Sequence, residues 1–470
     1  MIWTIARKDL LGALRDGRVR AGAVLLFVLG VIALASAAAR YSDLSRERTV
    51  AQALVEKQWQ QQGEKNPHSA AHYGLYAFRP ALPLAFFDPG VTAFEGVSIW
   101  LEAHKRNFAM GRPADDMTPL ARFGELSLAF VFQALMPLAL ILLGYAALSA
   151  ERESGTLRLV LSTGVTPLQL FAGKFVGLAA AFALLLAPLL ILCMVGLLWS
   201  TGSAWLAHAL VIVAAHSLYA ALMLALTLIV SARATTSQSA LLILLAFWSV
   251  TTFVLPRLAA DIGRAIQPTP RAAEFAAGLE STQAAGLGGV SSAQRIADRK
   301  AALLKLYKVE RDTDLPINFQ GVVFTLQDEL SNAAYDKQFA ELDRAIDAQV
   351  SVIAAASALS PRMALGLLSQ DIAGTSLQHQ RHFERAAEDF RRRVMETLNR
   401  DITFNSRAGS ADYRAGPELW RKVGAFQYSG ESLRASLSRS GAPLMVLVLW
   451  SVALVFIGWS TMRRLRVLAS

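Results

Sequence analysis

Charged side chains are scarce in this chain. Asp, Glu, Lys and Arg make up 17% of its 470 residues, whereas soluble domains usually contain about a quarter. Hydrophobic residues account for 54% of the chain, and the mean hydropathy is +0.38. Membrane-spanning helices explain these values, because each one needs roughly 20 mostly uncharged residues to cross about 30 Å of hydrocarbon. The composition therefore argues against an ordinary soluble protein.

Cysteine is nearly absent, since Cys193 is the only one and lies in an apolar stretch. This excludes an intrachain disulfide framework and a cysteine-rich metal site. A phosphate-binding Gly-x-x-x-x-Gly-Lys-Ser/Thr motif is also missing, because Gly164 and Lys174 are too far apart and no Ser or Thr follows the lysine. We find no catalytic Ser/His/Asp set. The sequence thus predicts no enzyme activity, no metal and no cofactor in this chain.

Six stretches are long and apolar enough to cross a bilayer. They cover residues 19–39, 126–148, 175–199, 205–230, 239–258 and 442–462. Prolines within them are tolerable, because neighbouring helices and local distortion can satisfy the freed carbonyl groups. We expect an all-α integral membrane protein with six transmembrane helices.

The first stretch could also be a signal peptide, because arginines precede it and it ends in the small residues Ala35, Ser36 and Ala37. It is long for a signal sequence, and its removal would leave an odd number of spans. These points favour an uncleaved anchor. Residues 1–18 alternate apolar and basic positions at near-helical spacing, which predicts a short interfacial helix on the cytoplasmic surface or a simple polar flank of the first span.

Basic residues indicate the orientation of the spans. They lie before the first span, between the second and third, between the fourth and fifth, and in the tail at 463–470, whereas the turn at 200–204 has none. This predicts that both termini are cytoplasmic. The formal charge of +10 could suggest nucleic acid, but its placement at span ends favours the lipid bilayer as the partner and no nucleic acid.

Two polar segments must then be external. Residues 40–122 contain a charged helical stretch and then a proline-rich, aromatic-rich part, which predicts a helix followed by an irregular loop. Residues 259–440 repeat apolar residues every three or four positions, which predicts a mainly helical domain inserted before the last span. Pro361 interrupts the moderately apolar stretch at 352–368, so we expect an external helix there and not a seventh span.

The predicted cytoplasmic loop at 150–174 contains the most informative motif. Gly155 suits a turn or a close helix approach. A short amphipathic helix follows, with Leu157, Val160 and Leu161 on one face. Such a helix between two spans can transmit force, because its apolar side chains can bind in the groove of a partner.

Several features together resemble a permease subunit of the type-2 ABC exporter family. They are the interfacial helix at 1–18, the six spans, the paired cytoplasmic termini, the Glu-Arg-Glu-Ser-Gly-Thr-Leu stretch at 151–157, the Gly-Val-Thr-Pro stretch at 164–167 and the Gly-Lys pair at 173–174. The Glu/Gly-Thr-Leu motif is fairly specific in a loop between the second and third spans.

The long insert narrows the resemblance to a bacterial subgroup of these permeases with a large external domain before the last span. The supporting features are the Ala-Leu-Ser-Pro-Arg-Met-Ala-Leu stretch at 358–365, the Ala-Gly-Thr stretch at 373–375 and the charged helix that contains His379 and His382. Compact members of the family have much smaller external parts, so the resemblance does not identify a substrate.

The resemblance implies that the loop docks on a separate ATPase subunit, which binds ATP and Mg²⁺. The ATPase-coupling residues would be Glu151, Arg152, Glu153, Gly155, Thr156, Leu157, Val160 and Leu161. It also implies a homodimer, or a heterodimer with a paralogous permease, that exports or extracts a substrate. The size of the insert leaves a mechanotransmission complex open, which would drive a periplasmic protein without moving a substrate. A receptor or scaffold without an ATPase is the third alternative.

Two pairs of histidines were considered as functional residues. His216 lies within the fourth span, where an ionisable side chain indicates either a transport pathway or a helix–helix hydrogen bond, whereas His208 is nearer the external end. His379 and His382 lie about one helical turn apart, but their charged surroundings favour a solvated helix face over a metal site.

Overall fold

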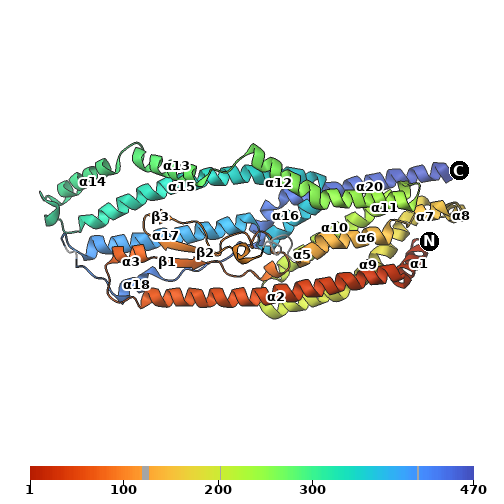
Figure 1. Cartoon of the computed structure of the whole chain (residues 1–470), viewed down its shortest axis with the longest axis horizontal. Helices are drawn as coiled ribbons and strands as arrows, with labels where there is room; N and C mark the ends of the chain where they lie inside the picture. Colours follow the sequence, from red (N-terminus) through yellow and green to blue (C-terminus); the bar gives the residue numbers. More distant parts are fainter. Residues whose placement is uncertain (119–125, 202, 410–411, 470) are drawn as a thin grey trace.

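The computed structural model of the chain describes residues 1–118, 126–201, 203–409 and 412–469. The end of the 40–122 segment therefore lies outside the described residues. Figure 1 shows an elongated molecule, with both termini at one end and a separate helical lobe at the other. We call the described parts of 1–40, 126–258 and 441–469 the bundle, and those of 41–118 and 259–440 the head.

Among the described residues, six helical segments are long and apolar enough to cross a membrane, which confirms a multi-pass membrane protein. The segments comprise α2 (Gly17–Gln60); α5 (Leu128–Phe130), η3 (Val131–Leu135), α6 (Met136–Gly144) and α7 (Ser149–Glu153); α9 (Pro167–Thr201); α10 (Leu206–Arg233); α11 (Ser237–Ser249), η4 (Val250–Val254) and α12 (Leu255–Ile266); and α20 (Gly441–Ala469). Two shorter helices, α1 (Ile2–Arg15) and α8 (Thr156–Ser162), lie at the terminal end of the bundle. We call that end the loop end.

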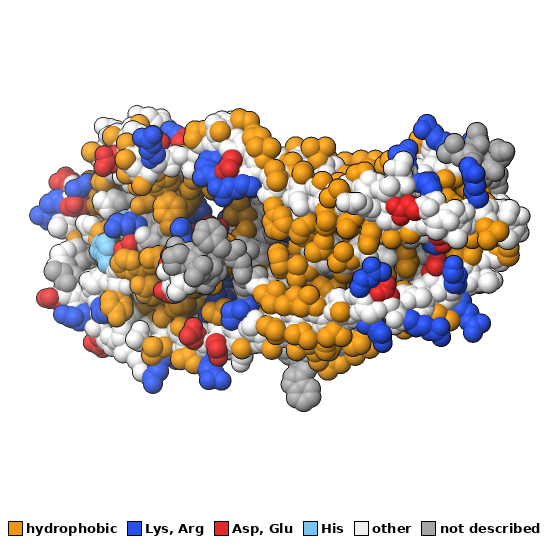
Figure 2. All heavy atoms as spheres, turned by 45° about the vertical axis from the view of Figure 1, so that its right-hand side comes forward, with side chains coloured by type: hydrophobic (Ala, Val, Ile, Leu, Met, Phe, Trp, Pro, Cys, Tyr) orange, Lys and Arg blue, Asp and Glu red, His pale blue; other side chains and the backbone are white. Residues whose placement is uncertain are grey.

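The outer surface of the bundle is apolar. Large hydrophobic side chains such as Leu25, Ile191, Val195, Val455 and Phe456 are exposed. Figure 2 shows these hydrophobic side chains as a continuous area between two regions that carry most of the charge. A surface of this kind suits contact with lipid, because it would be costly in water.

Helix α2 is much longer than its predicted span. It has 44 residues, so at 1.5 Å per residue it is roughly 66 Å long, about twice the thickness of a hydrocarbon layer. Neither Gly nor Pro occurs between Arg40 and Gln60, so nothing interrupts the helix after the apolar part. The predicted span and the predicted charged helix therefore form one rod that runs from the bundle into the head (Figure 1).

The head is mainly helical. Its α-helices are α3 (Pro67–Tyr73), α13 (Ala272–Ala285), α14 (Ser292–Tyr307), α15 (Phe319–Ala356), α16 (Pro361–Ala373), α17 (Leu377–Asn405), α18 (Pro417–Val423) and α19 (Leu433–Arg439). Its short 3-10 helices are η1 (Pro83–Phe86), η2 (Pro113–Asp116), η5 (Asp312–Asp314) and η6 (Ser357–Leu359).

The head also contains a three-stranded antiparallel sheet in the order β1 (Leu75–Phe78), β2 (Ser98–Glu102) and β3 (Lys105–Arg106). Leu75 pairs with Leu101, and Leu101 pairs with Arg106. The prediction of a helix followed by an irregular loop for this segment was therefore incomplete. These strands are short, and their buried face is stabilised by α17, which is distant in the sequence.

One apolar cluster joins both polar segments into a single core. Trp59 from α2 and Trp420 from α18 pack edge to face at 5.5 Å between ring centroids, where Phe383 and Phe390 of α17 also contribute. Each tryptophan donates a hydrogen bond from its indole: Trp59 Nε1 to the Trp420 carbonyl at 3.2 Å, and Trp420 Nε1 to the Gly63 carbonyl at 2.8 Å. The end of the first span is thereby attached to the insert.

The stretch at 352–368 does not form a seventh span. It is divided among the end of α15, η6 and α16. Helix α16 buries Ala364, Leu365 and Leu368 in the same apolar cluster as the bundle. The head therefore sits directly on the bundle, with α16 as the contact layer.

We predict that Trp420→Ala destabilises the head by about 3–5 kcal/mol, because it deletes a fully buried aromatic side chain. Thermal unfolding in detergent, followed by circular dichroism, measures the effect. Trp3, which is 79% exposed, provides the matched control Trp3→Ala. Equal melting temperatures for the two variants would contradict the assigned role of Trp420.

Candidate functional site

The 150–174 segment forms a compact corner at the loop end. Helix α7 ends at Glu153, Gly155 adopts φ +75°, and α8 begins at Thr156. An added Cβ on Gly155 would meet nothing within 4 Å, so the left-handed backbone, and not lack of space, favours glycine here. The Thr156 hydroxyl donates to the Glu151 carbonyl at 3.3 Å. These contacts hold α8 at a fixed angle to α7.

The three charged residues of the motif point into the chain. Glu151 accepts a hydrogen bond from Lys174 of α9 at 2.7 Å. Arg152 donates to the carbonyl groups of Ala232 and Ala234 at the end of α10. Glu151 and Arg152 therefore attach α7 to two different spans.

Glu153 attaches the corner to the next span. Its carboxylate accepts two hydrogen bonds of 2.8 Å from Ser237, one from the backbone N–H and one from the hydroxyl. Ser237 is the first residue of α11, so the negative charge lies at the positive end of that helix. Taken together, the motif connects α7 with α9, α10 and α11.

Leu157 does not present an apolar side chain to a partner, contrary to our expectation. It is 7% exposed and packs with Leu148, Val165, Leu170 and Met462, and Val160 and Leu161 pack partly against the same cluster. The helical spacing that aligns these residues turns them toward the bundle, because apolar groups of the same chain are available there.

The outward face of α8 carries different residues. Leu159 is 67% exposed, and Arg158, Ser162 and Thr163 are exposed beside it. Leu157, Val160 and Leu161 therefore support the corner from inside, whereas the predicted residues Glu153, Gly155 and Thr156 are exposed. Leu159 is the apolar side chain that a partner could bind. The amphipathic pattern predicted the helix. Which of its sides faces the bundle depends on contacts with residues that are distant in the sequence.

Helix α1 is packed against the corner through α9. A Cβ on Gly173 would lie 2.7 Å from Ile5, and a Cβ on Gly177 would lie 2.5 Å from the Ala6 carbonyl oxygen. Only glycine permits this approach. Lys174, between the two glycines, is 4% exposed and lies 3.6 Å from Asp9 of α1 in addition to its bond with Glu151. One ammonium group thus joins α1, α7 and α9.

A second feature is a cavity of about 460 Å³ within the bundle. His216 and Ser217 of α10 are the polar residues in an otherwise apolar lining that includes Phe132, Phe175 and Phe182. His216 Nδ1 lies 2.8 Å from the Ile212 carbonyl oxygen, and its Nε2 lies 3.4 Å from Gln133 Nε2. The residue therefore lines a cavity and contacts a neighbouring helix, so both interpretations of His216 stay open.

The second and fifth spans each contain a π-helical turn, η3 and η4, directly beneath the head. Such turns frequently mark functional positions in helices. Trp248 Nε1 donates to the Ala134 carbonyl of η3 at 2.9 Å. Ser360, which caps the start of α16, and Arg362 within α16 donate to the carbonyl groups of Thr251 and Thr252 in η4, both at 3.3 Å. The head therefore contacts the irregular backbone of the fifth span directly.

A buried carboxylate lies at the same level. Asp88 is 4% exposed; one oxygen accepts from the Gly90 backbone N–H at 3.1 Å, and the other accepts from Gln133 at 3.5 Å. Burial raises the pKa of Asp88, although the hydrogen bond from the Gly90 backbone N–H opposes this effect. Gln133 of the second span therefore contacts both Asp88 of the head and His216 of the fourth span, and the three side chains form one polar network.

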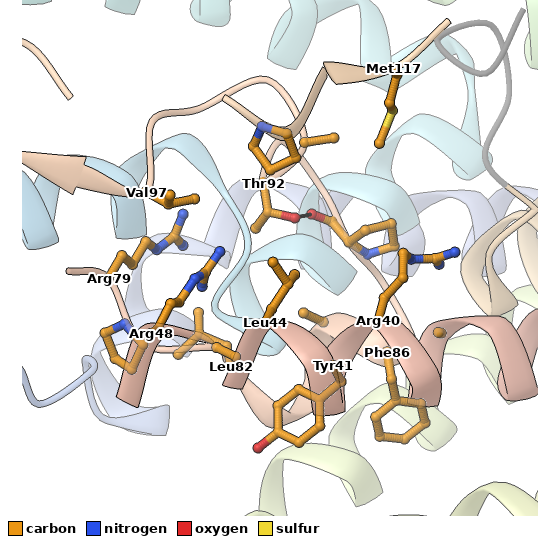
Figure 3. Close-up of a pocket in the computed structure, with 17 residues that line it drawn as sticks. Arg40, Tyr41, Leu44, Arg48, Arg79, Leu82, Phe86, Thr92, Val97 and Met117 are labelled. Atoms are coloured by element: carbon orange, nitrogen blue, oxygen red, sulfur yellow. Dashed lines mark hydrogen bonds between the residues drawn. The ribbon is translucent and has the colours of Figure 1, made fainter. Parts of the chain in front are cut away.

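Arginines gather where α2 passes from the bundle into the head. Arg40, Arg48 and Arg79 line a small cavity of about 90 Å³, and Figure 3 shows Arg48 and Arg79 side by side. Arg79 donates to Gln380 Oε1 at 2.7 Å and to the Gly374 carbonyl at 3.1 Å. Arg79 is 3% exposed, so it belongs to the interior of the head.

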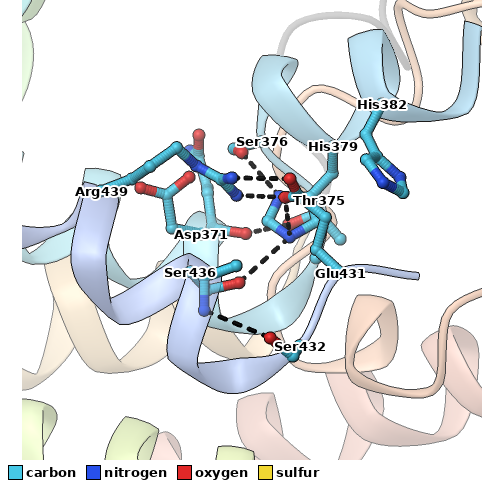
Figure 4. A network of polar contacts seen from close by, with 12 residues as sticks. Asp371, Thr375, Ser376, His379, His382, Glu431, Ser432, Ser436 and Arg439 are labelled. Atoms are coloured by element: carbon cyan, nitrogen blue, oxygen red, sulfur yellow. Dashed lines mark hydrogen bonds and ion pairs between the residues drawn. The ribbon is translucent and has the colours of Figure 1, made fainter. Parts of the chain in front are cut away.

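His379 does not lie on a solvated helix face, contrary to our expectation. It is 3% exposed; its Nδ1 lies 2.9 Å from the Ser376 hydroxyl, and its Nε2 lies 3.3 Å from Glu431. Figure 4 shows this network and His382 pointing away from it. Desolvation lowers the pKa of His379 to about 4 despite the opposing charge of Glu431. Residues 431–440, which are distant in the sequence, cover this part of α17 and bury the side chain.

A cluster of three other histidines was missed by the sequence analysis. His68 and His72 on α3 and His104 between β2 and β3 bring their ring nitrogens within 4.8 Å of one another. Burial, together with the neighbouring His72 and His104, lowers the pKa of His68 to about 4. The spacing of His68 and His72 was a usable signal, but His104 joins them only through the sheet.

Comparison with known proteins gives one family. A family model described as a domain of unknown function (DUF3526) matches residues 276–429. The match begins in α13 and ends after α18, so it lies in the head and includes none of the six apolar helices. No curated protein matches the chain.

We predict that Lys174→Met loosens α1, because it leaves the carboxylates of Asp9 and Glu151 buried near each other without their cation. Removing one partner of a buried ion pair costs about 3–5 kcal/mol. Hydrogen exchange of the α1 amide groups should become faster.

The control is the triple variant Asp9→Asn, Glu151→Gln, Lys174→Met, which removes all three charges and should restore most of the protection. Unchanged exchange in the single variant would show that Lys174 does not hold α1 in place.

Proposed function

We propose that this chain is the transmembrane permease subunit of an ATP-driven type-2 ABC transporter in a bacterial inner membrane. The observation that carries the proposal is the corner at the loop end. Helix α7 is attached there by Glu151, Arg152 and Glu153 to three spans, and the adjoining helix α8 exposes Leu159 on its outer face. A push on this face would reach several spans at once.

In this proposal ATP and Mg²⁺ bind to a separate ATPase subunit beneath the loop end. The permease works as a homodimer or as a heterodimer with a paralogous permease. Its termini are cytoplasmic, and the head is periplasmic. The orientation is supported by Arg158 and Arg233 at the loop end, because cytoplasmic loops of membrane proteins are enriched in basic residues.

In this proposal the substrate binds in the cavity beside His216. Its volume of about 460 Å³ and its largely apolar lining fall within the range of ligand-binding sites. Such a lining fits the hydrocarbon part of an amphiphile, with His216 and Ser217 available for a polar group. Movement of the second and fourth spans would change its shape, because Phe132, Ile212 and His216 line it from both.

A second candidate is mechanotransmission, in which the same motion acts on a periplasmic protein. Two observations favour it. Helix α2 continues from the bundle into the head without a break, and α16 is bonded to η4 through Ser360 and Arg362. A tilt of the bundle would therefore move the head.

We predict that Leu159→Asp disrupts the complex with the ATPase while the chain still folds, because the side chain is 67% exposed. Loss of a central apolar contact typically costs 2 kcal/mol or more, which corresponds to an affinity about 30-fold weaker. Co-purification with the proposed ATPase subunit, and stimulation of its ATP hydrolysis, measure the effect.

The matched control is Leu306→Asp, which makes the same change at a leucine of α14 in the head that is 70% exposed. It should leave the complex intact. Full ATPase stimulation by the Leu159 variant would rule out α8 as the contact, and the absence of any ATPase gene nearby would favour a receptor or scaffold.

Reconstitution into sealed vesicles separates the two candidates. A transporter with its ATPase should move a fluorescent amphiphile between leaflets in an ATP-dependent manner, and Ala220→Trp should slow this by filling the cavity that Ala220 lines. A mechanotransmitter would leave every tested amphiphile in place but would still change protease sensitivity of the head upon ATP addition.

A further inference from the structure

The three histidines of the head come from two segments that the sheet brings together. His68 and His72 lie four residues apart on α3, so they share one face of that helix. Their Nε2 atoms are 3.1 Å apart. The His104 ring lies 5.5 Å from the His68 ring and 5.4 Å from the His72 ring, measured between centroids.

The backbone holds His104 in an unusual conformation. Its φ is +61°, in the left-handed region that residues other than glycine rarely adopt. The residue lies in the short turn between β2 and β3. Asn or Gly also fits such a turn, and histidine adopts this region more often than most other residues, so the turn places the imidazole without a special conformational cost.

A carboxylate lies beside the ring of His104. Asp328 Oδ1 of α15 lies 2.8 Å from His104 Nδ1, and the other Asp328 oxygen accepts a hydrogen bond from Asn399 of α17 at 2.7 Å. Asp328 is 7% exposed. If the ring turned to donate from Nδ1 to this carboxylate, Nε2 of His104 would keep a free lone pair, as in metal-binding histidines.

The ring of His68 is also fixed in place. It stacks on Phe324 of α15 with 3.7 Å between centroids and 2° between planes. Asn66 caps the start of α3 by accepting from the backbone N–H groups of His68 and Ser69. Two of the three rings are therefore positioned by α15, so the cluster is prepared by the fold of the head.

We propose that His68, His72 and His104 bind one Zn²⁺ ion, with Asp328 as the residue that orients His104. Zinc prefers imidazole nitrogen at about 2.0–2.1 Å in a tetrahedral arrangement, in which the ligand atoms are about 3.3 Å apart. The 3.1 Å separation of the first two nitrogens is close to that value. The fourth position would hold water, because His72 is exposed.

The bound ion would join elements of both polar segments. It would link α3 to the β2–β3 turn and, through Asp328 and Asn399, to α15 and α17. Because a ligand that binds the folded state alone stabilises it, zinc would stabilise the head. The proposal does not depend on the transport role, since the purified chain alone would bind the ion.

The test uses the full-length chain in detergent, with any affinity tag removed, titrated with ZnCl₂ in a calorimeter. We expect one Zn²⁺ per chain and a higher melting temperature in its presence. His72→Ala should weaken binding at least tenfold with little effect on the metal-free melting temperature, because His72 is exposed. His104→Asn, which keeps a residue that tolerates the left-handed turn, should do the same.

Two further variants sharpen the result. His382→Ala removes a histidine of the head that lies outside the cluster, and it should bind zinc like the wild type. Asp328→Asn should weaken binding about 10–100-fold, as expected for a group that orients a metal ligand. Substitution with Co²⁺ should give the intense visible bands of a four-coordinate site. Equal zinc binding by the wild type and by His72→Ala, or no binding by either, would overturn the proposal.

Discussion

The rest of the structure depends on the continuity of helices across the boundary between bundle and head. Helix α2 has 44 residues, whereas roughly 20 suffice to cross the hydrocarbon, so its second half must stand beyond the lipid as part of the head. A helix cannot bend sharply without a proline, a glycine pair or a π-turn, and the second half of α2 has none of them. The core formed by Trp59 and Trp420 is thus fixed directly to the first span.

At the loop end, a charged motif forms hydrogen bonds within the protein. Glu151, Arg152 and Glu153 bond to Lys174, to two carbonyl groups and to Ser237. The backbone N–H groups at the start of a helix and the carbonyl groups at its end have no partners within that helix. Near the lipid they need hydrogen-bond partners from elsewhere in the chain. The motif supplies these partners for α10 and α11 and leaves the outer face of α8 exposed. The same contacts that stabilise the corner would carry force from it.

The sequence allowed prediction of the features that depend on a single segment. The six spans follow from local composition, and the turn at Gly155 and the short α8 follow from the order of residues within one loop. The inward orientation of Leu157, the burial of His379 and the meeting of His104 with His68 could not be predicted. Each depends on a second segment that lies far away in the chain: Met462, Glu431 and the β1–β2 pairing, respectively. Periodicity shows that a helix has two faces but not which face is covered.

The contact between α16 and the fifth span limits how the bundle can move. Ser360 and Arg362 bond to carbonyl groups of η4, and those carbonyl groups lie where the π-turn leaves the regular helical pattern. The hydrogen bond from the charged Arg362 is worth about 1.5–3 kcal/mol and that from the neutral Ser360 hydroxyl about 0.5–1.5 kcal/mol, whereas an unsatisfied buried carbonyl costs about 1–3 kcal/mol. Tilting the fifth span alone would break these bonds, whereas moving α16 with it would keep them. The lower-energy path is therefore a joint motion, in which any push at α8 that reaches α11 and η4 also displaces the head.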